Sequence, residues 1–322
     1  MTPERFNQAV EIVRRLREEI SRAVVGQTET VNTVLASLLA GGHVLLEGVP
    51  GLGKTLLVRA LGKTFAGQFS RIQFTPDLMP ADVSGHAFLD LKEHQFTLRR
   101  GPIFANLVLA DEINRAPAKT QAALLEAMQE RQVTIEGEAN PLPAPFMVLA
   151  TQNPIDQEGT YPLPEAQLDR FLVKVLIDYP TADEELALVK QITGSQVGDA
   201  LDVGAVNTLI KPETVLALQQ LVAEIRVDEQ VLDYAVRIVR ATRDWPGLSI
   251  GASPRGAIAL VRVARAFALI DGRDFVTPDE IKRAALPVLR HRVALAPEAE
   301  LEGLTADRTL AGLLEQLPAP RA

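Results

Sequence analysis

The sequence predicts an α/β fold in which helices flank a five-stranded parallel sheet and a smaller all-α domain follows. Short apolar runs alternate with helical patterns between residues 43 and 177, and helical patterns alone continue beyond residue 181. A glycine-rich segment also joins the first apolar run to the next helical pattern. The 322 residues suffice for about two domains of roughly 150 residues each. We therefore expect a first domain over residues 1–180 and a second over 181–322.

Two helices are expected before the first strand. Thr2 precedes Pro3, a pairing typical of helix starts, and apolar residues then recur at helical spacing as far as Ile20. A second helical pattern covers about residues 29–39 and ends at two glycines. The connection between the two helices is the short segment 24–27 (VVGQ).

The expected strands are continuous apolar runs, as is typical of strands buried on both faces of a parallel sheet. They cover residues 43–47, 71–74, 107–110, 146–150 and 172–177. Helical patterns lie between them at residues 54–64 and 117–131. Two further segments, 82–101 and 133–145, interrupt this alternation and predict β-hairpins inserted in the first domain.

Two helices of the second domain carry clear start signals. Ser253 and Pro254 provide a cap and a proline at the first helical position. Thr277 is followed three residues later by Glu280, which predicts a capping box. These signals support a helical second domain.

Composition excludes several classes of function. Apolar residues make up 47% and charged residues 23% of the chain, which excludes a largely disordered protein. Acidic residues outnumber basic ones by 41 to 33, and the net charge of −8 disfavours binding to nucleic acid through a positive field. The absence of cysteine excludes disulfides and thiolate metal sites and fits a reducing compartment.

No targeting or membrane segment is expected. The N-terminus has acidic residues and no apolar core, so it does not resemble a signal peptide. No apolar stretch approaches the ~18 residues that a membrane span needs. The sequence therefore predicts a cytoplasmic protein without membrane insertion.

Residues 48–55 (GVPGLGKT) match the phosphate-binding pattern G-x-x-x-x-G-K-[ST], here called the P-loop. Glycines allow backbone N–H groups to turn toward phosphate oxygens, and the following helix directs its positive end at them. We expect Lys54 to reach the β- and γ-phosphates and the Thr55 hydroxyl to bind Mg²⁺. The expected nucleotide-binding residues of this segment are Gly48, Pro50, Gly51, Leu52, Gly53, Lys54, Thr55 and Leu56. The flanking strand and helix patterns disfavour the alternative, a turn that binds nothing.

The third expected strand ends in two adjacent carboxylates, Asp111 and Glu112. Two adjacent carboxylates repel each other and lose solvation at a cost in stability, unless a cation or a reacting group interacts with them. With a P-loop upstream, Asp111 is the expected Mg²⁺ partner and Glu112 the expected base that activates water. Together the two motifs predict a nucleoside triphosphatase.

The order of the motifs resembles the AAA+ ATPases, and within them the MoxR group. The resemblance covers nearly the whole chain. The general AAA+ motifs are the P-loop unit and residues 111–116 (DEINRA), 150–154 (ATQNP), 168–171 (LDRF) and 251–255 (GASPR). Longer matches to the MoxR group are residues 74–82 (FTPDLMPAD) and 158–166 (EGTYPLPEA). The implied fold is that of a P-loop NTPase of the AAA+ type with a C-terminal helical lid.

The resemblance also implies roles for three polar side chains. Asn153 would be the sensor that orients the attacking water, and Arg170 would be the arginine finger, which reaches the γ-phosphate bound by the neighbouring subunit. Arg255 would be the second sensor, carried by the lid. In the first helical turn a cation is unfavourable by about 0.3–1 kcal/mol, a cost that nearby phosphate would reverse. Whether Arg255 acts in its own subunit or the next stays open.

Weaker assignments complete this picture. Val25 and Gly26 lie where AAA+ proteins hold the adenine ring, with Val25 against the base. Arg115 and Arg131 are further candidates for contacts across the subunit interface. The two hairpins match insertions of this group, which would project toward a pore or a partner protein.

The resemblance implies a ring-forming, hexameric, Mg²⁺-dependent enzyme that converts ATP to ADP and phosphate. It would act as a chaperone-like remodeller or activator of partners with von Willebrand factor A domains, in enzyme maturation or metal-cofactor insertion.

Three alternatives stay open. The first is a magnesium-chelatase ATPase subunit, which the stretches around Asp77 and Tyr161 argue against. The second is a DNA-acting motor, for which the basic candidates are Lys92, His94, Arg99 and Arg100 in the first hairpin and Arg290, His291 and Arg292 near the end. The third is a scaffold that binds ATP without hydrolysing it.

Overall fold

The computed structural model describes residues 2–24, 26–49, 51–90, 94–153, 160–193 and 203–320. Among the residues named above, Val25, Pro50 and Lys92 lie outside this set, as do Pro154 and the first two residues of the 158–166 stretch.

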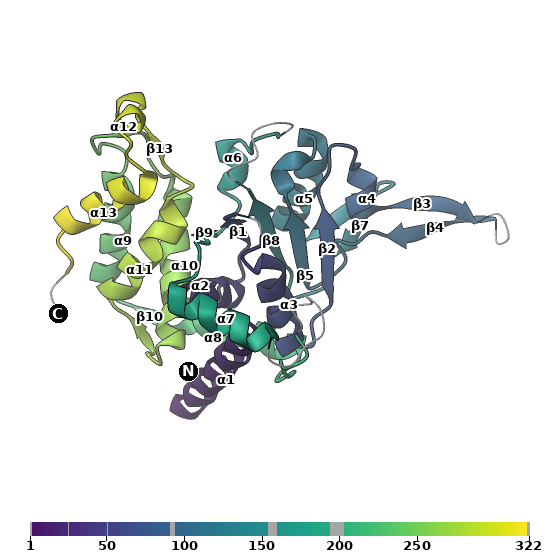
Figure 1. Cartoon of the computed structure of the whole chain (residues 1–322), viewed down its shortest axis with the longest axis horizontal. Coiled ribbons are helices and arrows are strands. Elements are labelled where there is room, and N and C mark those ends of the chain that lie inside the picture. Colours follow the sequence, from purple (N-terminus) through teal and green to yellow (C-terminus); the bar gives the residue numbers. More distant parts are fainter. Residues whose placement is uncertain are drawn as a thin grey trace.

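A five-stranded parallel sheet forms the centre of the first domain (Figure 1). Its strand order is β2-β5-β8-β1-β9, and every neighbouring pair is parallel. The strands are β1 (Val44–Glu47), β2 (Phe69–Gln73), β5 (Leu107–Asp111), β8 (Met147–Gln152) and β9 (Val173–Leu176). Because all five run the same way, the loops after β1, β5 and β8 meet at one edge of the sheet.

Alternate residues of the central strands enter two different cores. Leu107 and Leu109 pack into the larger cluster, with the helices α1 (Pro3–Ala23), α2 (Thr28–Leu39) and α3 (Lys54–Thr64). Val108 and Ala110 pack into the smaller cluster, with α5 (Ala118–Glu130). Burial on both faces explains why these strands are apolar throughout, without alternation of polar residues.

Short elements connect these layers. They are α4 (Pro80–Ser84), the 3₁₀-turn η1 (Ile113–Arg115) and α6 (Glu165–Leu168). Thr2 caps α1 as expected, by accepting a hydrogen bond from the Arg5 backbone N–H at 3.4 Å. Among the described residues, no helix combines the length and the apolar character that crossing a bilayer requires.

Both expected hairpins are present. β3 (Gly85–Asp90) pairs with β4 (Gln95–Arg100) and extends away from the body of the molecule in Figure 1. β6 (Gln132–Ile135) pairs with β7 (Glu138–Pro141). Gly85 begins the first hairpin at φ 92°, where a Cβ would lie 2.2 Å from the Arg99 carbonyl oxygen, so the close strand approach requires glycine.

The C-terminal part is mainly helical. Its helices are α7 (Ala182–Thr193), α8 (Pro212–Glu224), α9 (Glu229–Ala241), α10 (Pro254–Ile270), α11 (Pro278–Leu289), α12 (Pro297–Leu301) and α13 (Ala306–Gln316). The capping box of α11 is confirmed, since Glu280 accepts from the Thr277 backbone N–H at 2.7 Å. Ser253 occupies the cap position of α10, but its side chain makes no capping hydrogen bond.

The expectation of helices alone beyond residue 181 was incomplete. β10 (Arg226–Val227) pairs with β12 (Phe275–Val276), and β11 (Leu248–Ile250) pairs with β13 (Ala294–Leu295). Each of these strands has only two or three residues. A two-residue alternation cannot be recognised in so short a segment, so periodicity gives no signal for them.

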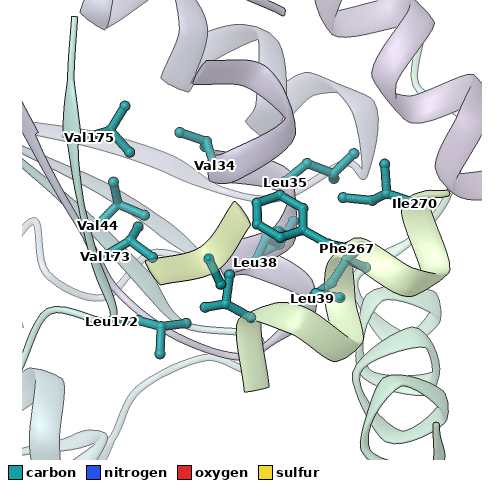
Figure 2. Close-up of a cluster of buried hydrophobic side chains, with 14 of the residues drawn as sticks. Val34, Leu35, Leu38, Leu39, Val44, Leu172, Val173, Val175, Phe267 and Ile270 are labelled. Carbon is teal, nitrogen blue, oxygen red and sulfur yellow. The ribbon is translucent and has the colours of Figure 1, made fainter. Parts of the chain in front are cut away.

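The lid packs against α2 and the β9 edge of the sheet. Phe267 and Ile270 from α10 meet Leu35 and Leu39 from α2 within one buried cluster (Figure 2). Polar contacts reinforce this interface, because the Arg283 guanidinium lies 3.0 Å from Glu29 of α2 and 3.3 Å from Asp271. The lid is therefore anchored beside the sheet through a continuous apolar core.

Candidate functional site

A cavity of about 420 Å³ lies where β1, β5 and β8 end and α3 begins. It brings together nine of the expected site residues, which are Gly51, Leu52, Gly53, Lys54, Thr55, Leu56, Asp111, Glu112 and Asn153. The complete lining is Gly51, Leu52, Gly53, Lys54, Thr55, Leu56, Arg59, Arg71, Gln73, Asp111, Glu112, Thr151 and Asn153. Residues from β2, β5 and β8, from the loop after β1 and from α3 thus share a single pocket, as the parallel sheet predicts.

The P-loop glycines adopt conformations that other residues rarely reach. Gly51 has φ 87° and Gly53 has φ 74°, both in the left-handed region. A Cβ built on either glycine would meet no atom within 4 Å, so the space in front of the loop is open. Gly48 is required for a different reason, because a Cβ there would lie 2.5 Å from the Ile177 carbonyl oxygen. The loop is a cradle shaped to receive a phosphate group.

Lys54 begins α3 and turns its amine back to the loop, where Nζ donates to the Gly48 carbonyl oxygen. Burial lowers the pKa of Lys54, although the negative charges of Asp111, Glu112 and Glu47 oppose this shift. A partly desolvated ammonium group gains from an additional anion. Phosphate oxygens in the cradle would therefore stabilise its charged form.

Asp111 is held by two neighbours. The Thr151 hydroxyl donates to Oδ1 at 2.6 Å, and Arg71 Nη2 donates to Oδ2 at 2.6 Å. The Thr151 oxygen also accepts from the Glu112 backbone N–H at 2.8 Å. Thr151 therefore fixes both acidic positions relative to β8.

At Glu112 the backbone turns away from the direction of β5, with φ 55°, an uncommon conformation for a residue with a Cβ. Its Oε2 accepts from Gln73 Nε2 at 2.7 Å and from Arg115 Nη1 at 3.0 Å. The turn directs the carboxylate into the cavity beside Asn153. Such backbone outliers concentrate at functional sites.

Four lining residues were missed by the sequence analysis: Arg59, Arg71, Gln73 and Thr151. Arg71 and Gln73 alternate along β2 and so share a face, and Thr151 stands two positions before Asn153. For these three residues, closeness in sequence to the predicted strand ends was the signal that could have placed them at the site. The hydrogen bonds of Arg71, Gln73 and Thr151 with Asp111 and Glu112 were visible only in three dimensions.

A divalent cation could be held by the Thr55 hydroxyl and the Asp111 carboxylate. Oxygen donors of this kind suit Mg²⁺, which usually takes one or two protein ligands together with phosphates and water. Within the described parts of the chain, no group of three or more His, Asp or Glu residues is arranged to hold a metal by itself. The donor set fits a cation that is shared with a bound nucleotide.

The turn between α1 and α2 lies beside the P-loop. Gln27 Nε2 donates to the Leu52 carbonyl oxygen at 3.3 Å. Gly26 has φ 70°, and a Cβ there would lie 2.6 Å from the Glu184 side chain of α7. Gly26 does not line the 420 Å³ cavity, but its turn is joined to the phosphate cradle through Gln27.

Arg170 and Arg255 lie elsewhere, in a second cavity of about 320 Å³. We call it the arginine cavity because its lining includes Arg131, Arg170, Arg255, Arg262 and Arg292. Asp169 is the one acidic residue of that lining, and its carboxylate lies 3.6 Å from Arg255 Nη1. Within the described residues, Arg170 has no carboxylate partner. The predicted catalytic residues therefore form two groups, and the arginine group is suited to bind an anion.

Comparison with known proteins agrees with this arrangement. Residues 43–173 match the family described as "ATPase family associated with various cellular activities (AAA)", and residues 240–312 match the "AAA lid domain". The chain is 48% identical to the uncharacterized protein YeaC of Bacillus subtilis, over 94% of this chain and 93% of that protein. It is 42% identical to Chaperone MoxR1 of Mycobacterium tuberculosis, over 97% and 83% respectively.

A solved structure extends the likeness to three dimensions. The crystal structure of a proposed ATPase from Cytophaga hutchinsonii superposes with a TM-score of 0.90 at 40% identity, covering 99% of this chain and 98% of that one. The P-loop and the acidic pair lie within the first family match, and the second match lies within the lid. The chain is an AAA+ ATPase and belongs to the MoxR family.

Proposed function

We propose that this ATPase works as a ring, for which we expect six subunits, with each Mg²⁺-dependent site shared between two neighbours. The observation that carries the proposal is the separation of the expected catalytic residues into two cavities. Lys54, Glu112 and Asn153 line one cavity, whereas Arg170 and Arg255 line the other. A second subunit that presents its arginine cavity to the phosphate cradle of the first would complete the site.

Within one subunit the roles follow from position. The cradle and Lys54 bind the phosphates, and Thr55 and Asp111 would hold a magnesium ion, which would supply positive charge next to the phosphate oxygens. Glu112 accepts a proton from the attacking water, which Asn153 orients. Gln73 and Arg115 hold the Glu112 carboxylate in place through hydrogen bonds to Oε2.

The arginine cavity supplies the complementary charge. Burial, together with the positive charge of the nearby Arg131, lowers the pKa of Arg262, and an anion bound in this cavity would favour its charged form. Transferred phosphate carries negative charge over three oxygens, and an arginine finger stabilises that charge. Arg170 and Arg255 are therefore proposed to act on the nucleotide of the neighbouring subunit.

We place the boundary between the two domains near residue 180, in the segment between the end of β9 at Leu176 and the start of α7 at Ala182. The relative described as a chaperone supports a role in remodelling partner proteins. Partners with von Willebrand factor A domains, a part in enzyme maturation and a cytoplasmic location follow from the family resemblance and belong to the same proposal.

ATP hydrolysis per mole of chain is expected to increase with protein concentration, because assembly completes each shared site. The measurement is steady-state phosphate release over a wide range of chain concentration, with Mg²⁺ and with EDTA as the control. Activity should vanish in EDTA at every concentration. Specific activity that stays constant while the oligomeric state changes would contradict the shared site.

Thr151→Val is expected to lower kcat by about tenfold, equivalent to about 1.4 kcal/mol at the transition state. Valine keeps the shape of threonine but removes the hydrogen bonds to Asp111 Oδ1 and from the Glu112 backbone N–H. Steady-state kinetics check this, with Thr151→Ser as the control because serine retains the hydroxyl. Equal losses in the two variants would show that packing rather than hydrogen bonding matters at this position.

A further inference from the structure

The basic triplet Arg290, His291 and Arg292 follows α11 and faces inward instead of forming a surface for nucleic acid. Arg290 Nη1 donates to the Lys174 carbonyl oxygen at 3.2 Å, and His291 Nε2 lies 3.0 Å from the Phe171 carbonyl oxygen. The Arg292 side chain is only 4% exposed. The whole triplet thus contacts the segment that leads from Arg170 into β9.

Arg292 makes the densest set of contacts. Its Nε donates to Asp169 Oδ1 at 2.7 Å, and its Nη2 donates to the carbonyl oxygens of Asp169 at 3.2 Å and Phe171 at 2.7 Å. Its Nη1 donates to the Leu172 carbonyl oxygen at 3.1 Å and to that of Val288. A planar guanidinium with five N–H groups can satisfy such a set, and a point-like ammonium cannot.

Among the described residues, the hydrogen bonds of Arg292 lie on both sides of Arg170, and none of them involves the Arg170 side chain. They fix the backbone on both sides of it, at Asp169 and at Phe171. They also fix the Asp169 carboxylate, whose second oxygen lies 3.6 Å from Arg255. The positions of Arg170 and Arg255, the two arginines expected to bind phosphate, therefore both depend on the buried Arg292 of the lid.

Holding the lid in place does not by itself require this cation. The lid is already anchored by the apolar contact of α10 with α2 and by Arg283. A buried charge costs desolvation energy that an apolar contact would avoid. The burial of Arg292 against Asp169 is better explained by a need for precise geometry at residues 169–171.

We propose that Arg292 is a positioning residue for ATP hydrolysis, which sets the turn 169–171 so that Arg170 and Arg255 can reach the nucleotide of the neighbouring subunit. The inference rests on the shared site proposed above. Through this contact a displacement of the lid would move Arg170, so the lid conformation of one subunit would control hydrolysis in the next.

The test uses Arg292→Lys, which keeps the charge but loses most of the hydrogen bonds. Displacement of a catalytic group by about 1 Å can cost about 100-fold in rate, so we expect kcat to fall by about 10- to 100-fold. The Kd for ATP should stay within about twofold, because Arg292 does not line the phosphate cavity. Arg283→Lys is the matched control, since Arg283 also joins the lid to the first domain but does not contact residues 169–172.

Mixed assemblies separate positioning from a general structural role. Two differently tagged chains are co-expressed and purified through both tags, so that each assembly contains both. An Arg292→Lys chain retains its own Lys54 and Glu112, and a Glu112→Gln neighbour can still supply a correctly placed Arg170. We expect this mixture to regain activity, and the mixture of Arg292→Lys with Arg170→Ala to stay inactive.

Each outcome decides the question. Recovery with Glu112→Gln and none with Arg170→Ala supports the inference. Wild-type activity of Arg292→Lys overturns it, as does an inactive mixture with Glu112→Gln when the reference pair of Arg170→Ala and Glu112→Gln recovers. If that reference pair also stays inactive, the shared site itself is wrong and the inference falls with it.

Discussion

Glu112→Gln is expected to lower kcat for ATP hydrolysis by about 100- to 10,000-fold, the usual contribution of a positioned general base. Glutamine has nearly the same shape, and its carbonyl oxygen can still accept a hydrogen bond from Gln73 or Arg115. It cannot accept a proton from water at neutral pH. ATP should therefore bind nearly as well as in the unchanged protein, while the chemical step is lost.

The measurement combines steady-state phosphate release with direct ATP titration. Glu213→Gln is the matched control, because Glu213 is an exposed glutamate of α8 outside both cavities. Its activity should equal that of the unchanged chain. Normal turnover in Glu112→Gln would mean that another group activates the water, and it would remove Glu112 from the mechanism.

Arg170→Ala is expected to reduce kcat by about 1,000- to 100,000-fold, the range found for arginine fingers. The affinity for ATP should change little, since Arg170 does not line the cavity that contains the P-loop. Lys54→Ala should behave in the opposite way and weaken binding directly, because Lys54 belongs to the cradle. The contrast between the two variants tests the division of the site into two cavities.

The same kinetic and binding measurements apply to Arg170→Ala. Arg226→Ala serves as its control, because Arg226 is 73% exposed and pairs only with Asp274 on the lid surface among the described residues. Loss of ATP binding with retained turnover in Arg170→Ala would contradict its assignment. It would also leave the positive charge of the arginine cavity without a catalytic explanation.

The phosphate cradle could be predicted from sequence because its function depends on local backbone conformation. Gly51 and Gly53 are needed for positive φ angles, and Lys54 and Thr55 follow them directly on the same helix. Asp111 lies at the end of a buried strand, so its place at the sheet edge was implied by the strand pattern. For such features, neighbours in sequence are also neighbours in space.

The surroundings of the acidic pair could not be predicted in this way. Thr151 meets Asp111 across 40 residues of sequence, and the same separation lies between Arg71 and Asp111. Neighbouring strands of a parallel sheet are far apart along the chain, and their order depends on how the helices pack. The apolar pattern predicted the strands but not their spatial order in the sheet.

Local propensity and apolar periodicity were enough to predict the α/β fold class, the nucleotide cradle and the acidic pair. That Arg170 and Arg255 lie apart from that cradle, and that Arg292 is buried against Asp169, 123 residues away, depends on contacts between segments distant in the chain. A charged side chain looks the same in a sequence whether it faces solvent or a distant carboxylate. Its partner is selected when the lid packs on α2 and β9, because the free energy of that packing comes from apolar residues elsewhere in the chain.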